Sequence, residues 1–163
     1  MIFRILLLLA MLTTLLGCSA DGKDRKLSAI SDPCQSLGSN YVCEVQFERV
    51  YVNSELLAGR NIKLDGIIVV GMDALGHEEM AIFPSAERAN LCNLIYALRL
   101  KSDDKAIVEE VRLSSGMHVQ VAGKFNPGNA RNDFWGEINL IRPPSLISGV
   151  KHDLSCLNMT TKK

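Results

Sequence analysis

The sequence predicts a mainly β domain, a five-stranded Greek-key barrel with one helix between its third and fourth strands. Short segments of alternating hydrophobicity recur between residues 42 and 145, turn residues separate them, and one stretch among them has helical spacing. The chain has 163 residues, of which 47% are hydrophobic, and a formal net charge of zero. These values suit one domain with extensions, and they exclude a strongly basic nucleic-acid binder and an acidic disordered chain.

The first half of the domain contains three predicted elements. Residues 42–52 alternate polar with β-branched or aromatic residues, a pattern typical of a strand. Residues 53–59 predict a single helical turn, which a capping asparagine begins and a glycine ends. Residues 62–66 alternate and residues 67–70 are continuously apolar. Because the pattern changes at Gly66, we expect one long strand that is bent or bulged at this glycine.

Four further strands follow, all short. Residues 80–83 predict a strand that Pro84 closes, and residues 94–100 alternate with leucine and tyrosine on one face. The last two strands are marked by Val119, Val121 and Phe125, and then by Ile138 and Leu140 before Pro143 and Pro144.

A helix is predicted between the third and fourth of the barrel strands. Ser102 is the expected N-cap, and two aspartates in the first turn suit the positive end of a helix. Ile107, Val108 and Val111 form its apolar stripe, and Gly116 ends it.

The five strands from residue 62 onward, with one helix between the third and fourth, have the order of an OB-fold, and the N-terminal strand and helical turn are additions to it. Closure of the barrel removes the exposed edges that a small sheet would otherwise present. Residues 54–66, 121–128 and 134–138 resemble the beginning and end of OB-fold domains in uncharacterised bacterial envelope proteins. The resemblance covers about residues 42–145 and implies a fold but little about activity. The alternative architecture is an α+β roll with an open antiparallel sheet.

The N-terminus predicts export and lipid anchoring. Residues 1–17 carry one charge, at Arg4, and a mostly apolar run too short for a membrane-spanning helix, the pattern of a secretory signal. Residues 15–18 (Leu-Leu-Gly-Cys) resemble the bacterial lipobox, which implies a diacylglycerol thioether on Cys18 and a palmitate on its amino group. Ser19 after the cysteine favours, by the same resemblance, the outer membrane. The alternatives are a buried apolar helix and ordinary signal cleavage.

The mature chain is therefore expected to begin with a polar tether, residues 18–33, followed by the barrel, residues 34–145, and a C-terminal tail, residues 146–163. The other four cysteines, an even number in an oxidising compartment, predict two disulfides. Three pairings are possible, and we favour Cys34–Cys43, which closes a short loop, with Cys92–Cys156, which fastens the tail. The alternative is four free buried thiols. No CxxC spacing occurs and the chain has three histidines, so no metal site is expected.

Motifs for catalysis or cofactor binding are absent from the sequence: it has no GxSxG, HExxH, P-loop or dinucleotide fingerprint. His77, in a predicted loop, and His118, on a predicted strand, are expected at the surface. The strongest binding candidate is the loop of residues 126–135, which is rich in turn residues and contains Arg131, Phe134 and Trp135. OB-folds use this loop, with strands two and three, to bind oligonucleotides and oligosaccharides. The alternative is a hairpin whose two aromatic rings close the barrel, one pointing in and one out.

These observations predict a non-enzymatic binding or assembly module, anchored by acyl chains in the membrane and facing the periplasm. Its expected partner is an envelope protein, a peptide or a glycan, because a chain without excess basic residues does not suit nucleic acid. The alternative is a small envelope hydrolase acting on glycans or peptides.

Overall fold

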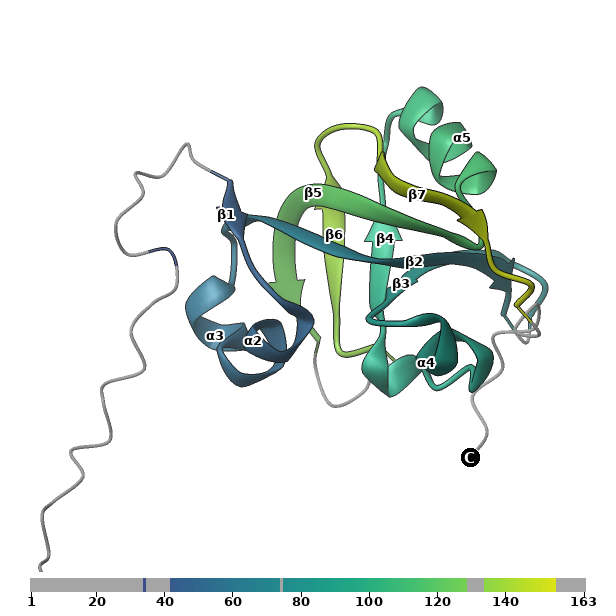
Figure 1. The fold of residues 1–163 in the computed structure, drawn as a ribbon. Coiled ribbons are helices and arrows are strands. Elements are labelled where there is room, and N and C mark those ends of the chain that lie inside the picture. Colours follow the sequence, from purple (N-terminus) through teal and green to yellow (C-terminus); the bar gives the residue numbers. More distant parts are fainter. Residues whose placement is uncertain (1–33, 35–41, 74, 129–133, 155–163) are drawn as a thin grey trace, which may run out of the picture. The chain divides into compact units, whose positions relative to one another are not determined.

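The computed structural model describes residues 34, 42–73, 75–128 and 134–154, all within one compact unit of residues 32–163. In chain order its elements are β1 (Cys43–Glu44), α2 (Phe47–Val52), α3 (Ser54–Leu57), β2 (Asn61–Met72), β3 (Glu78–Phe83), α4 (Ala86–Asn90), the 3₁₀ helix η2 (Leu94–Tyr96), β4 (Leu98–Lys101), α5 (Lys105–Leu113), β5 (Met117–Pro127), β6 (Gly136–Leu140) and β7 (Ser145–Lys151) (Figure 1).

Strands β2 to β6 close into a barrel. Antiparallel pairing joins β2 to β3, β3 to β4 and β6 to β5, while β4 and β6 run parallel. The ring closes because β2 also pairs with β5, from Asn61 opposite Lys124 to Ile67 opposite His118. Helix α5 connects β4 to β5, between the third and fourth strands of the barrel. The prediction of a five-stranded, OB-fold-like barrel with one helix at this position is confirmed.

Strand β2 bends at Gly66, as the change of pattern predicted. Its first half pairs with β5 and its second half with β3, so the strand turns from one side of the barrel to the other. A Cβ atom at Gly66 would collide with the carbonyl oxygen of Phe83, which explains the glycine. The apolar run that follows is buried on both faces: Ile68 belongs to the barrel core, whereas Ile67 and Val69 belong to a second cluster.

Two apolar clusters stabilise the domain. The larger fills the barrel and includes Leu64, Leu98, Phe125 and Ile138. The second lies where α4 and η2 cover part of the outer side of β2 and β3; its members are Ile67, Val69, Ala81, Phe83, Ala89, Leu94, Ala97 and Phe134. Full burial of a valine, leucine, isoleucine or phenylalanine side chain contributes about 1.5–3 kcal/mol to the free energy of unfolding.

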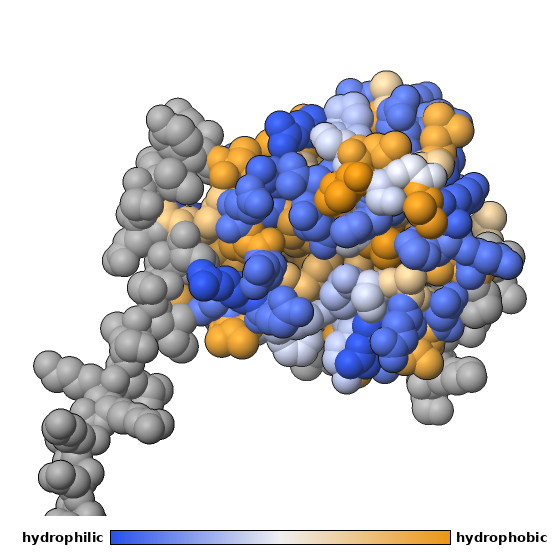
Figure 2. Space-filling view, viewed as in Figure 1, coloured by the Kyte–Doolittle hydropathy of each residue, from blue (hydrophilic) through white to orange (hydrophobic). Residues whose placement is uncertain are grey.

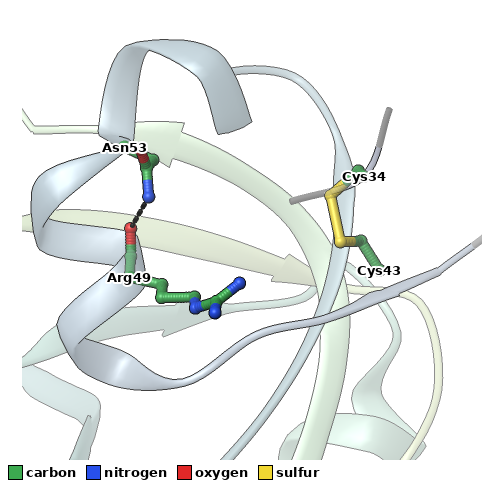
Figure 3. The surroundings of a disulfide bond; sticks show 4 residues. All are labelled: Cys34, Cys43, Arg49 and Asn53. Atoms are coloured by element: carbon green, nitrogen blue, oxygen red, sulfur yellow. Dashed lines mark hydrogen bonds between the residues drawn. A yellow bond between two sulfur atoms is a disulfide. The ribbon is translucent and has the colours of Figure 1, made fainter. Parts of the chain in front are cut away.

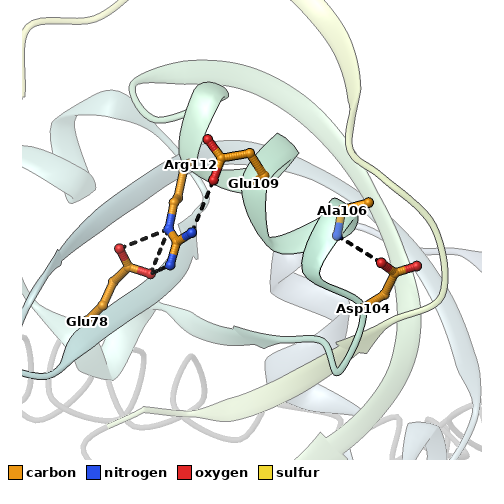
Figure 4. Close-up of polar contacts among 5 residues, drawn as sticks. All are labelled: Glu78, Asp104, Ala106, Glu109 and Arg112. Carbon is orange, nitrogen blue, oxygen red and sulfur yellow. Dashed lines mark hydrogen bonds and ion pairs between the residues drawn. The ribbon is translucent and has the colours of Figure 1, made fainter.

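Helix α5 packs Ile107 and Val111 against the barrel core. Its N-cap is Asp104, whose Oδ1 accepts a hydrogen bond of 2.8 Å from the Ala106 amide (Figure 4). The expected cap at Ser102 is therefore wrong by two residues: Ser102 Oγ accepts instead from the Asp104 amide, at 3.2 Å, and so holds the turn that enters the helix.

The outer side of α5 is tied to β3 by an ion-pair network. Arg112 donates from Nε and from an Nη atom to the Glu78 carboxylate, with its shortest contact at 2.9 Å, and from its other Nη to Glu109 (Figure 4). Hydrogen bonds to the two carboxylates raise the pKa of Arg112, with the bond to Glu78 contributing most. These groups are exposed, so the network contributes little to stability and mainly orients α5.

Two predicted strands are partly helical. Residues 42–52 form a two-residue strand, β1, and then helix α2, because the buried Phe47 and Val50 also fit the three-residue spacing of a helix. Residues 94–100 begin as the 3₁₀ turn η2, since Asn93 Oδ1 accepts from the Ile95 amide at 3.3 Å and caps it; only residues from Leu98 onward form a strand.

The sheet continues past residue 145, the predicted end of the domain. Strand β7, within the expected tail, pairs with β5 between Met117 and Gln120 and lies at the end of the strand order. Leu146, Ile147 and Val150 are exposed on it, and Figure 2 shows hydrophobic surface over this strand. Among the described residues, none of the helices has the length and apolar character needed to cross a membrane.

Candidate functional site

The loop that joins β5 to β6 is held closed at its base. The Gly128 amide donates to the Trp135 carbonyl oxygen at 2.7 Å, and the Trp135 amide donates to the Ala97 carbonyl oxygen at 3.2 Å. Gly128 is required there because a Cβ atom would collide with the carbonyl oxygens of Trp135 and Phe134. The base therefore fixes the position of both aromatic residues. Arg131, the third predicted site residue, lies outside the described residues.

The two adjacent aromatic residues have different surroundings. Phe134 is 5% exposed and belongs to the second apolar cluster, whereas Trp135 is 42% exposed. One ring points in and the other out, as expected for neighbouring positions. The Arg99 guanidinium covers the Phe134 ring, 4.6 Å from its centroid. Phe134 is thus a structural residue, and Trp135 is the one that is available to a partner.

Trp135 stands in an aromatic surface together with Tyr51 and Tyr96. The Trp135 and Tyr51 rings meet edge to face, with centroids 5.1 Å apart and planes at 87°. Tyr51 donates from its hydroxyl to the Tyr96 carbonyl oxygen at 2.6 Å, which joins α2 to η2. The Arg88 guanidinium lies 4.4 Å above the Tyr96 ring. Burial is the main cause that raises the pKa of Tyr51, with the nearby Glu48 charge second, so its hydroxyl remains a donor.

A charged face lies beside the aromatic surface, on β3, β4 and β6. Arg99 Nε is 2.9 Å from Glu79 Oε2, as an ion pair rather than in line for a hydrogen bond. Two residues further along β4, Lys101 Nζ is 2.7 Å from Oε2 of Glu137 on β6. A small pocket of about 170 Å³ opens here between Arg99, Glu137 and Phe134. The face that OB-folds use for ligands therefore carries paired charges of both signs in this chain.

Sequence reasoning missed Tyr51, Tyr96, Arg88 and Arg99 as members of this region. The sequence predicts strands at Tyr51 and Tyr96, where the structure has helices, so it indicates neither the contact of Tyr51 with Trp135 nor its hydrogen bond to Tyr96. The three- and four-residue spacing of Phe47, Val50 and Tyr51 is the signal that could have indicated a helix.

The histidines have surface roles in the structure. His77 lies in the turn between β2 and β3, where Asp73 Oδ1 accepts from the amides of Leu75 and His77, each at 2.8 Å. These hydrogen bonds lower the pKa of Asp73, the one from the His77 amide most, and the His77 ring adds a contact at 3.3 Å. His118 is half-buried on β5. Across the described part of the chain, no three histidine, cysteine or acidic side chains are grouped to hold a metal ion.

A disulfide joins Cys34 to Cys43, with Cα atoms 5.6 Å apart (Figure 3). It fastens the chain ahead of β1 to the core, in which both cysteines are buried. Cys92 is disulfide-bonded as well, and Leu154, two residues before Cys156, packs against the same apolar cluster as Cys92. Cys156 and Cys18 lie outside the described residues, so the pairing Cys92–Cys156 and the lipidation of Cys18 remain predictions.

Comparison with known proteins adds one distant structural neighbour. No protein-family model and no curated protein matches the chain. It is similar to the crystal structure of a DUF3299 family protein from Pseudomonas aeruginosa PAO1, with 18% sequence identity and a TM-score of 0.38. The match covers 57% of this chain and 66%, just under two thirds, of that chain.

Proposed function

We propose that this protein is a lipid-anchored binding or assembly module of the bacterial cell envelope, held at the outer membrane and facing the periplasm. Its partner, an envelope protein, a peptide or a glycan, docks on the aromatic surface. The apolar leader followed by Leu-Leu-Gly-Cys supports the anchor, since one diacylglycerol and one further acyl chain give stable membrane attachment. The disulfide between Cys34 and Cys43 supports an oxidising compartment.

The exposed ring of Trp135 is the observation that carries the docking surface. Tryptophan and tyrosine dominate binding energy at interfaces because they bury a large area with few rotatable bonds. Contact with Tyr51 and the closed base of the loop already restrict the Trp135 side chain, so little conformational entropy remains to be lost when a partner binds. The ion pairs Arg99–Glu79 and Lys101–Glu137 would then orient the partner at the edge of the aromatic surface.

The anchor is tested by replacing Cys18 with alanine. Cells fed a labelled palmitate should label the wild-type protein but not Cys18→Ala, and the variant should leave the membrane fraction. Cys92→Ala is the control, because it removes a cysteine without touching the lipidation motif. Equal labelling of Cys18→Ala and wild type would overturn the anchor.

The docking surface is tested by photo-cross-linking in living cells. A photoreactive amino acid placed at Val52, which is 71% exposed and follows Tyr51, should yield a discrete adduct. Trp135→Ala should lower the adduct yield several-fold, whereas Leu113→Ala, which removes a 60% exposed side chain from α5, should leave it unchanged. An adduct that forms equally with and without Trp135 would show that this surface is not the docking site.

A further inference from the structure

The structure has a second and larger groove, of about 720 Å³. It opens between the segment Glu44–Arg49 and the barrel, with Leu64 and Pro84 in its lining. The polar side chains that line it are those of Glu44, Gln46, Glu48, Arg49, Asp65 and His118. Neither Tyr51, Tyr96 nor Trp135 lines this groove.

The groove exists because of a gap in the pairing of β2. Strand β1 pairs with β2 only at Ile62 and Lys63, and the Val45 amide continues this pairing onto the Lys63 carbonyl oxygen. Strand β3 begins to pair with β2 at Ile67. On this side of β2, Leu64 and Asp65 are therefore paired with neither β1 nor β3. The groove opens at this gap, beside the segment that leads from β1 into helix α2.

The lining divides into side chains with partners and side chains without. Glu44 is paired with Lys63 at 2.6 Å, and Asp65 accepts from Gln120 at 2.9 Å. The side chains of Gln46, Glu48, Arg49 and His118 form no hydrogen bond or ion pair with any residue the structure describes. Figure 3 shows the Arg49 side chain extending from α2, while Asn53 donates a hydrogen bond to the backbone carbonyl oxygen of Arg49.

These groups, which have no partner within the described part of the chain, favour one ligand chemistry. Since Glu44 is paired with Lys63 and Asp65 accepts from Gln120, the remaining lining charges are one carboxylate, at Glu48, and one guanidinium, at Arg49. An anion would therefore face Glu48 and a cation would face Arg49. Gln46, Glu48 and Arg49 are exposed to water, and an apolar ligand would remove this water without replacing its hydrogen bonds, which is unfavourable for each group. A neutral ligand rich in hydroxyl groups satisfies both signs, since each hydroxyl donates to a carboxylate and accepts from a guanidinium or an amide.

We propose that this groove binds a short neutral oligosaccharide. Glu48 accepts from sugar hydroxyls, Arg49 and Gln46 donate to hydroxyl or acetamido oxygens, and Pro84 contacts the apolar side of a sugar ring. The groove volume lies within the range of about 300–1,000 Å³ that small-molecule sites occupy. The site adjoins the aromatic surface through helix α2, where the Phe47 and Tyr51 ring centroids are 6.0 Å apart, but it shares no lining residue with it.

The test is a titration of ¹⁵N-labelled protein followed by amide NMR shifts. The probes are the trisaccharides of β-1,4-linked N-acetylglucosamine, α-1,4-linked glucose and β-1,4-linked glucose. At least one should shift the amides of Gln46, Glu48, Arg49, Asp65 and His118 in a saturable way. Glu48→Gln and Arg49→Ala should each weaken that affinity about tenfold, the effect of losing a hydrogen bond to a charged group. Glu55→Gln, an exposed carboxylate on α3, and Trp135→Ala should leave it unchanged.

Three results would overturn the proposal. None of the trisaccharides shifts the groove amides at about 10 mM, a concentration at which a millimolar complex would be largely formed. Alternatively, Glu48→Gln and Arg49→Ala bind as tightly as wild type. Finally, the shifts gather at Trp135 and Tyr96 and leave the amides of Glu48 and Arg49 unchanged, which would place the sugar on the aromatic surface and leave the proposed function standing.

Discussion

The ring of Trp135 meets that of Tyr51 edge to face, with centroids 5.1 Å apart, and the Tyr51 hydroxyl is bound to the Tyr96 carbonyl oxygen. These contacts join three segments that are distant in sequence: helix α2, the 3₁₀ helix η2 and the base of the loop between β5 and β6. An exposed tryptophan is thereby held by a part-buried tyrosine that has its own hydrogen bond. This arrangement makes the surface rigid in the free protein.

Replacing each of the two adjacent aromatic residues should affect stability differently. Trp135→Ala removes a half-exposed ring and one edge-to-face contact, so we expect a loss of about 1–2 kcal/mol in the free energy of unfolding. Phe134→Ala empties part of the second cluster and should cost about 3–5 kcal/mol. Urea denaturation of both variants measures the difference. Equal losses would mean that Trp135 belongs to the core rather than to a docking surface.

The disulfide at the start of the described chain should stabilise the fold by restricting the unfolded state. It closes a loop between cysteines nine positions apart, so the double variant Cys34→Ser/Cys43→Ser should lose about 2–3 kcal/mol. Urea unfolding of the oxidised proteins measures this loss. The single variants should be at least as unstable as the double, because each leaves a free thiol. A double variant as stable as wild type would contradict the expectation.

Two glycines of the barrel should not tolerate a side chain, and a third should. A Cβ atom at Gly66 would collide with the Phe83 carbonyl oxygen, and one at Gly123 with the Asn139 carbonyl oxygen. We expect Gly66→Ala and Gly123→Ala each to reduce the free energy of unfolding by about 1–3 kcal/mol or more. The melting temperature should fall accordingly. Gly149→Ala on β7 is the matched control, because nothing lies within 4 Å of its Cβ position. Its melting temperature should match that of wild type.

Tyr51 should make stability depend on pH in the alkaline range. Burial raises the pKa of Tyr51 above the ordinary tyrosine value of 10.0, so the folded state holds the phenol proton more tightly than the unfolded state. The resulting stabilisation is fully present below pH 10 and is lost as the pH rises above it. Tyr51→Phe should cost about 1 kcal/mol at pH 7 through its lost hydrogen bond. Its stability should fall less steeply than that of wild type between pH 10 and 11.5; parallel curves would refute this role for Tyr51.

The barrel could be predicted because its pattern is local. Gly66 marks a change from alternating to continuous hydrophobicity, and the structure explains it by burial of Ile67 and Ile68 on opposite faces of one strand. The helix after β4 was likewise visible in the spacing of Ile107 and Val111. In both cases a short continuous segment contains the whole pattern that predicts the element.

The candidate site could be predicted only in part, because it depends on contacts between distant segments. Alternation predicted that one of the two adjacent rings points out, but not which one. The partner of Trp135, Tyr51, lies in a six-residue helix whose apolar residues also fit a strand. Such a short helix is decided by tertiary packing rather than by propensity. The groove at Glu48 and Arg49 depends on the gap between β1 and β3, which no local pattern records.

The parallel pairing of β4 with β6 has a consequence for how the protein folds. Leu98 pairs with Gly136, and Ile62 pairs with Gly123, so the ring cannot close until almost the whole domain is available. Pairings between segments so far apart make folding slow, because the entropy of closing a long loop is lost before the contacts form. A nascent chain that ends before residue 136 lacks strand β6, so the ring cannot close until that strand has been synthesised.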